Sequence, residues 1–119
     1  MYICYENNIV NKISKIGYVC INYRIINILC IINNKYYYFE PHNGLMETGV
    51  ISIYGFNGNK EANYFFDESG ALNTSKGWHK CKDRYNSHYI WCYIDDNGEL
   101  AEGFKEINGN KYYFKNGVM

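Results

Sequence analysis

The residues of this chain best suited to bind a ligand are two tryptophans and a nearby tyrosine. Trp78 follows a glycine, and Trp91 and Tyr93 stand two positions apart in a later aromatic run. Because side chains alternate between the two faces of a strand, Trp91 and Tyr93 are expected on one face, with Cys92 and Ile94 on the other. Trp78 begins the strand that we expect to pair back against this one. The pattern predicts two indoles beside each other.

Later residues are expected to complete the walls and floor of a shallow aromatic box. Tyr112 and Tyr113 arrive from the next aromatic run, and Leu100 or Met119 would close the floor. Aromatic faces attract a quaternary ammonium at about 0.5–2 kcal/mol per contact, and they also pack against the apolar faces of sugar rings. The predicted ligand contacts are therefore Trp78, Trp91, Tyr93, Tyr112, Tyr113 and Leu100. The alternative is that these rings join neighbouring hairpins and bind no ligand, because aromatic residues supply most of the burial in a thin protein.

Two other groups of residues resemble metal sites by composition. His79, Cys81, His88 and Cys92 are zinc-type ligands, but they contain no Cys-x-x-Cys pair and match no common zinc spacing. The run that ends in Asn97-Gly98 is acidic, yet it lacks the alternating ligands of a calcium loop and is expected to be a turn. We predict no metal and no cofactor.

An enzyme is not expected either. The pairing of Cys81 with His79 or His88 is the one nucleophile and base available, and no oxyanion-stabilising element accompanies it. No paired carboxylates flank an obvious cleft.

A repeated pattern must position the aromatic residues. At the end of the chain, Asn108-Gly109 supplies the positive φ values of a hairpin turn, Lys111–Phe114 is a β-prone run, and Asn116-Gly117 closes it. Equivalent closing glycines stand at 44, 70 and 98. A large apolar residue lies two positions beyond each of the closing glycines: Met46, Leu72, Leu100 and Met119. Such self-similarity predicts an all-β array, a solenoid of stacked β-hairpins without helices.

The order of these elements resembles the cell-wall-binding repeats of Gram-positive surface proteins. That family includes choline-binding repeats, glucan-binding repeats and the C-terminal repeats of large clostridial toxins. The toxin form is the most similar, since Lys111 stands where the choline-binding form usually has tryptophan, and a lysine would repel a cation. The resemblance implies non-catalytic binding to a cell-surface saccharide or a choline-containing polymer, with a saccharide favoured. It also implies a secreted or cell-surface protein.

The repeats divide the chain into an N-terminal part and four units. Residues 1–31 are expected to form a degenerate repeat or cap, in which alternation over residues 18–24 predicts a strand. The clear repeats are expected over residues 32–119, with units at about 32–53, 54–78, 79–104 and 105–119. A structural alternative is an assembly module, a homodimer that forms through the terminal hairpin without a small ligand.

Composition excludes several classes of partner. The 119-residue chain has 12 basic and 12 acidic residues, so it has no net charge to attract nucleic acid. The apolar run over residues 16–32 is interrupted by Asn22, Arg24 and Asn27, which argues against a signal peptide and against insertion in a membrane. Five cysteines at irregular spacing are expected to pack as small hydrophobic residues rather than form a disulfide framework.

Overall fold

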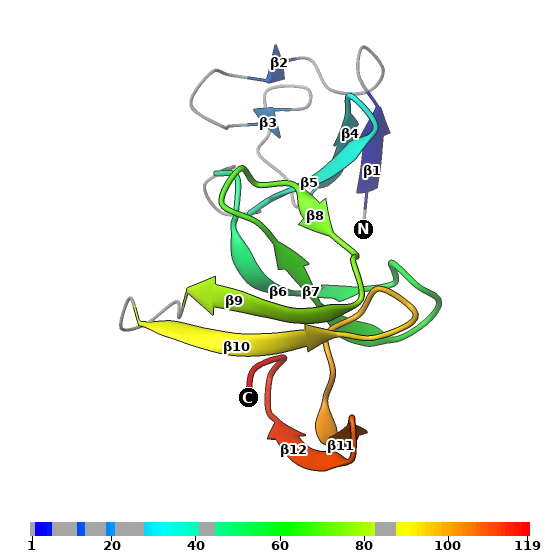
Figure 1. Cartoon of the computed structure of the whole chain (residues 1–119). Coiled ribbons are helices and arrows are strands. Elements are labelled where there is room, and N and C mark those ends of the chain that lie inside the picture. The colour runs from blue at the N-terminus through cyan, green and yellow to red at the C-terminus, as the bar shows by residue number, and fades with distance from the viewer. Residues whose placement is uncertain (1, 6–11, 14–18, 21–27, 41–44, 83–87) are drawn as a thin grey trace. The chain divides into compact units, whose positions relative to one another are not determined.

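The computed structural model describes residues 2–5, 12–13, 19–20, 28–40, 45–82 and 88–119 (Figure 1). All regular structure in these ranges is β-strand, and the sheets are small and mostly antiparallel. This confirms the predicted all-β class with β-hairpins. The chain forms two compact units, Met1–Thr48 with Glu68–Leu72 and Gly49–Asp67 with Asn73–Met119. The chain leaves the first unit after Thr48, returns to it over Glu68–Leu72, and enters the second unit again within β8 (Leu72–Asn73).

The first unit is built on one hairpin and one parallel strand. Antiparallel β4 and β5 are joined at Asn33 and Asn34, whose φ values of 52° and 63° give a tight hairpin turn. Strand β1 lies parallel to β4, and β2 pairs with β3. The bounds are β1 (Tyr2–Tyr5), β2 (Lys12–Ile13), β3 (Val19–Cys20), β4 (Ile28–Ile32) and β5 (Lys35–Phe39).

Some of the elements predicted for this unit lie on described residues and others do not. Of the strand expected over residues 18–24, β3 is present at Val19–Cys20, and the remainder lies outside the described residues. The closing turn expected at Asn43-Gly44 also lies outside them. Side chains of Leu29, Cys30, Tyr38, Phe39 and Ala71 form the buried core of this unit.

The second unit contains three consecutive hairpins. Each first strand begins with a glycine at positive φ, 88° at Gly49, 128° at Gly77 and 75° at Gly103, a conformation that side chains other than glycine rarely adopt. Each of these glycines precedes an apolar or aromatic residue, Val50, Trp78 or Phe104, and marks where a hairpin starts. The hairpins are β6 (Gly49–Tyr54) with β7 (Glu61–Phe66), β9 (Gly77–Lys82) with β10 (Tyr89–Ile94), and β11 (Gly103–Ile107) with β12 (Asn110–Phe114).

The segments that follow the hairpins connect them to earlier ones. Leu100 donates its backbone N–H to the carbonyl of Asn63 at 2.8 Å, and Met119 does the same to Trp91 at 2.9 Å. Both donors stand two positions beyond a closing glycine, and both acceptors lie on the second strand of the preceding hairpin. The recurring apolar residue of the sequence therefore marks a recurring contact between hairpins.

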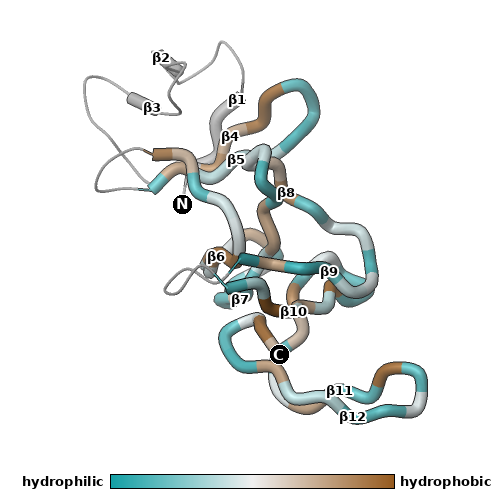
Figure 2. Tube along the Cα trace, turned by 60° about the vertical axis from the view of Figure 1, so that its left-hand side comes forward, coloured by the Kyte–Doolittle hydropathy of each residue, from teal (hydrophilic) through white to brown (hydrophobic). Residues whose placement is uncertain are grey.

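The core of the second unit includes two apolar clusters. One contains Phe65, Cys81, Cys92, Ile94 and Leu100, and the other contains Ala101, Ile107 and Phe114 with Trp78, Tyr93 and Tyr112 packed against it. Figure 2 shows that hydrophobic stretches along the chain are short and separated by hydrophilic ones.

The cysteine prediction needs a correction. Cys81 and Cys92 are buried, as expected of small hydrophobic residues, but they form a disulfide bond between β9 and β10. Their Cα atoms lie 6.6 Å apart, within the range that a disulfide spans. They occupy diagonal positions on the same face of the hairpin, a relation that depends on the strand register and not on spacing in the sequence. Cys30 is also disulfide-bonded.

Candidate functional site

The ring of Trp78 lies at the centre of an aromatic cluster in the second unit. Its centroid is 6.4 Å from that of Trp91, 5.3 Å from Tyr93 and 4.9 Å from Tyr112, all in edge-to-face orientation. Such edge-to-face pairs are a favoured geometry, because the positive edge of one ring meets the negative face of another. The structure thus brings together four of the predicted site residues.

Strand pairing explains how these rings meet. Tyr93 lies directly across from Trp78 in the β9–β10 ladder, and Trp91 lies across from Lys80, so all four project from one face of this hairpin. Cys81, Cys92 and Ile94 occupy the opposite face and pack in the other cluster. Tyr112 comes from β12 of the next hairpin. The site therefore joins consecutive hairpins.

Exposure divides the cluster into a supporting part and an accessible part. Trp78, Tyr93 and Tyr112 are partly buried, whereas Trp91 is 44% exposed. An exposed indole next to a fixed indole offers a flat apolar wall to a ligand. The neighbouring Tyr93 and Tyr112 carry hydroxyl groups that can form hydrogen bonds.

Two predicted contact residues lie elsewhere. Tyr113 is directly across from Phe104 in the β11–β12 ladder, with ring centroids 4.8 Å apart, on the face opposite Tyr112. Leu100 is 4% exposed and packs with Cys81, Cys92 and Ile94, behind the face that carries the indoles. In this structure neither residue adjoins Trp78.

A residue that the sequence analysis did not name completes the cluster. Phe114 is fully buried, and its ring lies 5.8 Å from that of Trp78. It stands two positions beyond Tyr112, so the same alternation that pairs Trp91 with Tyr93 would have identified it.

Charged residues around the cluster are lysines. Lys80 lies directly across from Trp91 on the same strand face, and its Nζ is 5.2 Å from the ring centroid of Tyr89. Lys111 lies across from Glu106 on the face of the β11–β12 hairpin opposite Tyr112. The positive charge closest in register to the exposed indole is therefore that of Lys80.

The candidate metal ligands do not converge in the described part of the chain. Within it, no group of three or more His, Cys, Asp or Glu side chains is arranged to hold an ion. Cys81 and Cys92 are bonded to each other, and His79 donates from Nε2 to the Ser75 carbonyl at 2.7 Å.

Among the described residues, no helix is long and apolar enough to cross a membrane.

Comparison with known proteins gives two kinds of similarity. Residues 102–119 match the family model for a putative cell wall binding repeat. The structure is similar to that of CbpJ from Streptococcus pneumoniae TIGR4, with a TM-score of 0.62 and 21% sequence identity over 86% of this chain. Choline binding protein F from Streptococcus pneumoniae is also similar, with a TM-score of 0.43 and 25% identity over 83% of this chain.

These similarities cover only part of the related structures. This chain spans 45% of the length of the CbpJ structure and 32% of that of choline binding protein F. No curated protein sequence matches this chain. The resemblance to cell-wall-binding repeats inferred from the sequence is confirmed: residues 102–119 match the model of a putative cell wall binding repeat, and the β-hairpin fold is similar to that of CbpJ.

Proposed function

We propose that this chain is a non-catalytic binding module that attaches to a polymer of the bacterial cell surface. The observation that carries the proposal is the aromatic cluster around Trp78, with the exposed ring of Trp91 at its edge. The cell wall binding repeat at residues 102–119 contributes Tyr112 to this same cluster. The sequence match and the cluster thus point to the same region of the chain.

The ligand that best suits this cluster is a saccharide. Sugar rings pack their apolar faces on aromatic rings and use their hydroxyl groups for hydrogen bonds, and Tyr93 and Tyr112 supply hydroxyl groups. A quaternary ammonium would also fit between aromatic faces, but it would meet the positive charge of Lys80, which lies across from Trp91. Choline-containing polymer is therefore the second choice for the ligand.

The proposed architecture and location follow from the repeats. The backbone hydrogen bonds from Leu100 to Asn63 and from Met119 to Trp91 are equivalent contacts in successive hairpins, which supports stacking of the hairpins as a solenoid. A module that binds a cell-surface polymer would act outside the cell. We therefore place the protein at the cell surface or in the secreted fraction.

A second candidate function is assembly through the β11–β12 hairpin. Phe104 is 80% exposed and Tyr113 is 52% exposed, and their rings contact each other on one face of this hairpin. Exposed neighbouring aromatic residues are typical of surfaces that pack against another protein. In this alternative, two copies of the chain would cover these rings and no small ligand would bind.

Ligand titration separates the two functions. Choline and a panel of oligosaccharides are added to the full chain while tryptophan fluorescence and heat of binding are recorded. The binding function predicts a saturable signal that Trp91→Ala removes without unfolding the protein. Tyr54→Ala is the matched control, because Tyr54 is an aromatic residue 62% exposed on another hairpin.

Sedimentation tests the alternative function, which is assembly into a dimer. No signal with any ligand, together with a concentration-dependent dimer that Phe104→Ala dissociates, would refute the binding function and support assembly. A saturable signal that persists in Trp91→Ala would place the ligand outside the proposed cluster.

A further inference from the structure

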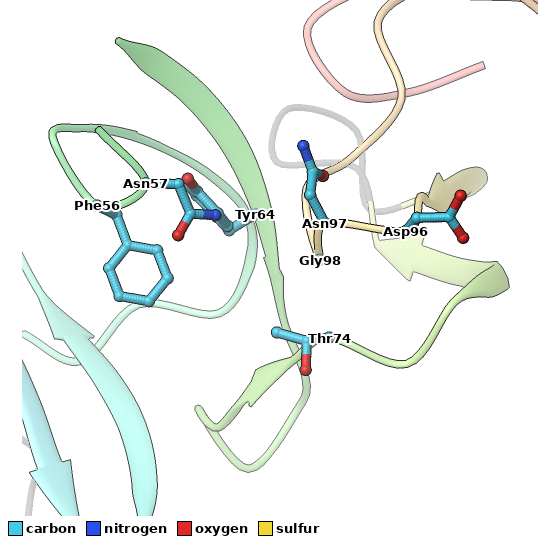
Figure 3. A pocket seen from close by; sticks show the side chains of 7 residues that line it. All are labelled: Phe56, Asn57, Tyr64, Thr74, Asp96, Asn97 and Gly98. Atoms are coloured by element: carbon cyan, nitrogen blue, oxygen red, sulfur yellow. The ribbon is translucent and has the colours of Figure 1, made fainter. Parts of the chain in front are cut away.

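A pocket in the second unit is separate from the aromatic cluster around Trp78. It has a volume of about 310 Å³ and is lined from two sides (Figure 3). Phe56 and Tyr64 of the β6–β7 hairpin lie on one side, and Asn97 and Gly98, in the turn after β10, lie on the other. Ligand pockets are commonly about 300–1,000 Å³, so this volume suits a ligand the size of one sugar ring.

A buried carboxylate fixes the two sides of this pocket. Glu99 is 7% exposed and accepts hydrogen bonds from Lys60 Nζ at 2.8 Å and Asn57 Nδ2 at 3.3 Å. Tyr64 Oη donates to the same carboxylate at 3.5 Å, while the Glu99 backbone N–H donates to Asn97 Oδ1 at 3.1 Å. Residues of both sides are therefore held by one group, and the pocket is formed before any ligand arrives.

The charges around the pocket are balanced within the protein. Glu99 is paired with Lys60 at 2.8 Å, and Asp96 is paired with Lys76 at 2.6 Å. The Asp96 carboxylate also points away from Phe56 and Tyr64 (Figure 3). A charged ligand would find no uncompensated partner among the described residues of the lining, so the pocket favours a neutral ligand.

Two amides are among the polar groups of the lining that remain available. Asn57 uses its Nδ2 on Glu99, which leaves its carbonyl oxygen as an acceptor. Asn97 uses its Oδ1 on the Glu99 backbone, which leaves its NH₂ group as a donor. Neither of these remaining groups has a partner within the described part of the chain. An acceptor and a donor on opposite sides are complementary to hydroxyl groups, which both donate and accept.

An aromatic wall completes the lining. The ring of Phe56 stands edge-to-face against Tyr64, with centroids 5.1 Å apart and planes at 89°. We infer that this pocket is a second ligand site, which binds a single neutral sugar ring between the Phe56 side chain and the amides of Asn57 and Asn97. The inference does not depend on the proposed cluster at Trp78, because the pocket contains neither tryptophan.

Nuclear magnetic resonance tests the inference on the full chain. The ¹⁵N-labelled protein is titrated separately with glucose, galactose and N-acetylglucosamine, and with choline chloride as a charged comparison. At least one sugar should shift the side-chain amide signals of Asn57 and Asn97 and the backbone amide of Gly98. The indole N–H signals of Trp78 and Trp91 should not move with it, and choline should leave the pocket signals unchanged.

Two variants make the test specific. Asn97→Asp keeps the acceptor for the Glu99 N–H but removes the free donor, so it should weaken binding about tenfold, as expected for loss of one hydrogen bond. Asn116→Asp changes the same residue type in the equivalent turn before Gly117 and should bind like the wild type. If Asn97→Asp does not fold, Phe56→Leu replaces it, because it removes the aromatic wall while preserving an apolar side chain.

Several results would overturn the inference. They are the absence of pocket shifts with all three sugars, or equal affinity in the wild type, Asn97→Asp and Phe56→Leu. Shifts confined to the tryptophan indoles would also overturn it, since they would assign the sugar to the aromatic cluster and leave the proposed function intact. Pocket shifts that persist in Trp91→Ala, in contrast, would support the second site even if the aromatic cluster around Trp78 binds no ligand.

Discussion

Truncation of the two tryptophans should separate folding from binding. Trp78 is partly buried and contacts several rings, whereas Trp91 is 44% exposed at the edge of the same cluster. We expect Trp78→Ala to destabilise the protein strongly, and Trp91→Ala to abolish binding while costing little stability. The expected difference in stability follows from the positions of the two residues alone, because both changes remove the same type of side chain.

The magnitudes follow from the ring contacts. Trp→Ala in a core costs about 3–5 kcal/mol, and each well-oriented aromatic pair contributes about 0.5–1.5 kcal/mol beyond burial. Trp78 meets Tyr112 at 4.9 Å, Tyr93 at 5.3 Å and Phe114 at 5.8 Å, but it is not fully buried. We therefore expect a loss of about 3 kcal/mol for Trp78→Ala. Trp91 meets Trp78 at the longer distance of 6.4 Å, so its truncation should cost about 1 kcal/mol or less.

Urea denaturation followed by circular dichroism measures both values. The Trp91→Ala protein should unfold near the wild-type midpoint and fail to bind, and Trp78→Ala should unfold at a much lower urea concentration. Equal destabilisation by the two changes would refute the division into a supporting and an accessible indole. A Trp91→Ala protein that binds with wild-type affinity would refute the assignment of the ligand to this cluster.

Three further predictions concern the framework of the second unit. Burial opposes ionisation of Glu99, but hydrogen bonds from Lys60 and Asn57 outweigh it and lower the pKa of Glu99. The contribution of Glu99 to the free energy of unfolding should therefore be complete above its unfolded pKa of about 4.3 and be lost as the pH falls through its lower folded pKa. Unfolding curves of Glu99→Gln should lack this pH dependence. Reduction of the Cys81–Cys92 disulfide, which closes a loop with a sequence separation of 11, should lower the free energy of unfolding by about 2–3 kcal/mol, and a midpoint insensitive to reductant would contradict this. Gly117→Ala should lower the free energy of unfolding by at least about 1 kcal/mol more than Gly109→Ala. Both glycines have a φ of 82°, but only a Cβ at Gly117 would approach other atoms within 4 Å, at 3.0 Å. Equal losses of stability in chemical denaturation would contradict this reasoning.

Local chemistry made much of the fold predictable from the sequence. Asn108-Gly109 is a pair of residues that tolerates positive φ, and it forms the expected hairpin turn. Alternation along β10 placed Trp91 and Tyr93 on one face, opposite Cys92, as the strand register has them. These features depend on neighbours a few residues away, so the sequence determines them directly.

Contacts between hairpins were harder to predict. Tyr112 and Tyr113 are adjacent on one strand and must face opposite sides, and their own sequence does not say which one meets Trp78. Leu100 follows a closing turn, and its position depends on the backbone hydrogen bond to Asn63 of an earlier hairpin. The Cys81–Cys92 disulfide likewise depends on the register between β9 and β10.

The pocket at Glu99 was missed for a related reason. A glutamate that follows Asn97-Gly98 has the composition of an ordinary exposed turn. Its burial results from the approach of Asn57 and Lys60, which lie about 40 residues earlier in the chain. A lone glutamate gives no sign of such long-range partners.

Cosedimentation with purified bacterial cell walls tests the central proposal most directly. The wild-type chain and the Tyr54→Ala control should sediment with the walls, and Trp91→Ala, folded by circular dichroism, should remain in the supernatant. Retention of Trp91→Ala at the wild-type level, or failure of the wild-type chain to sediment with any wall preparation that contains saccharide or choline-bearing polymer, would contradict the proposal.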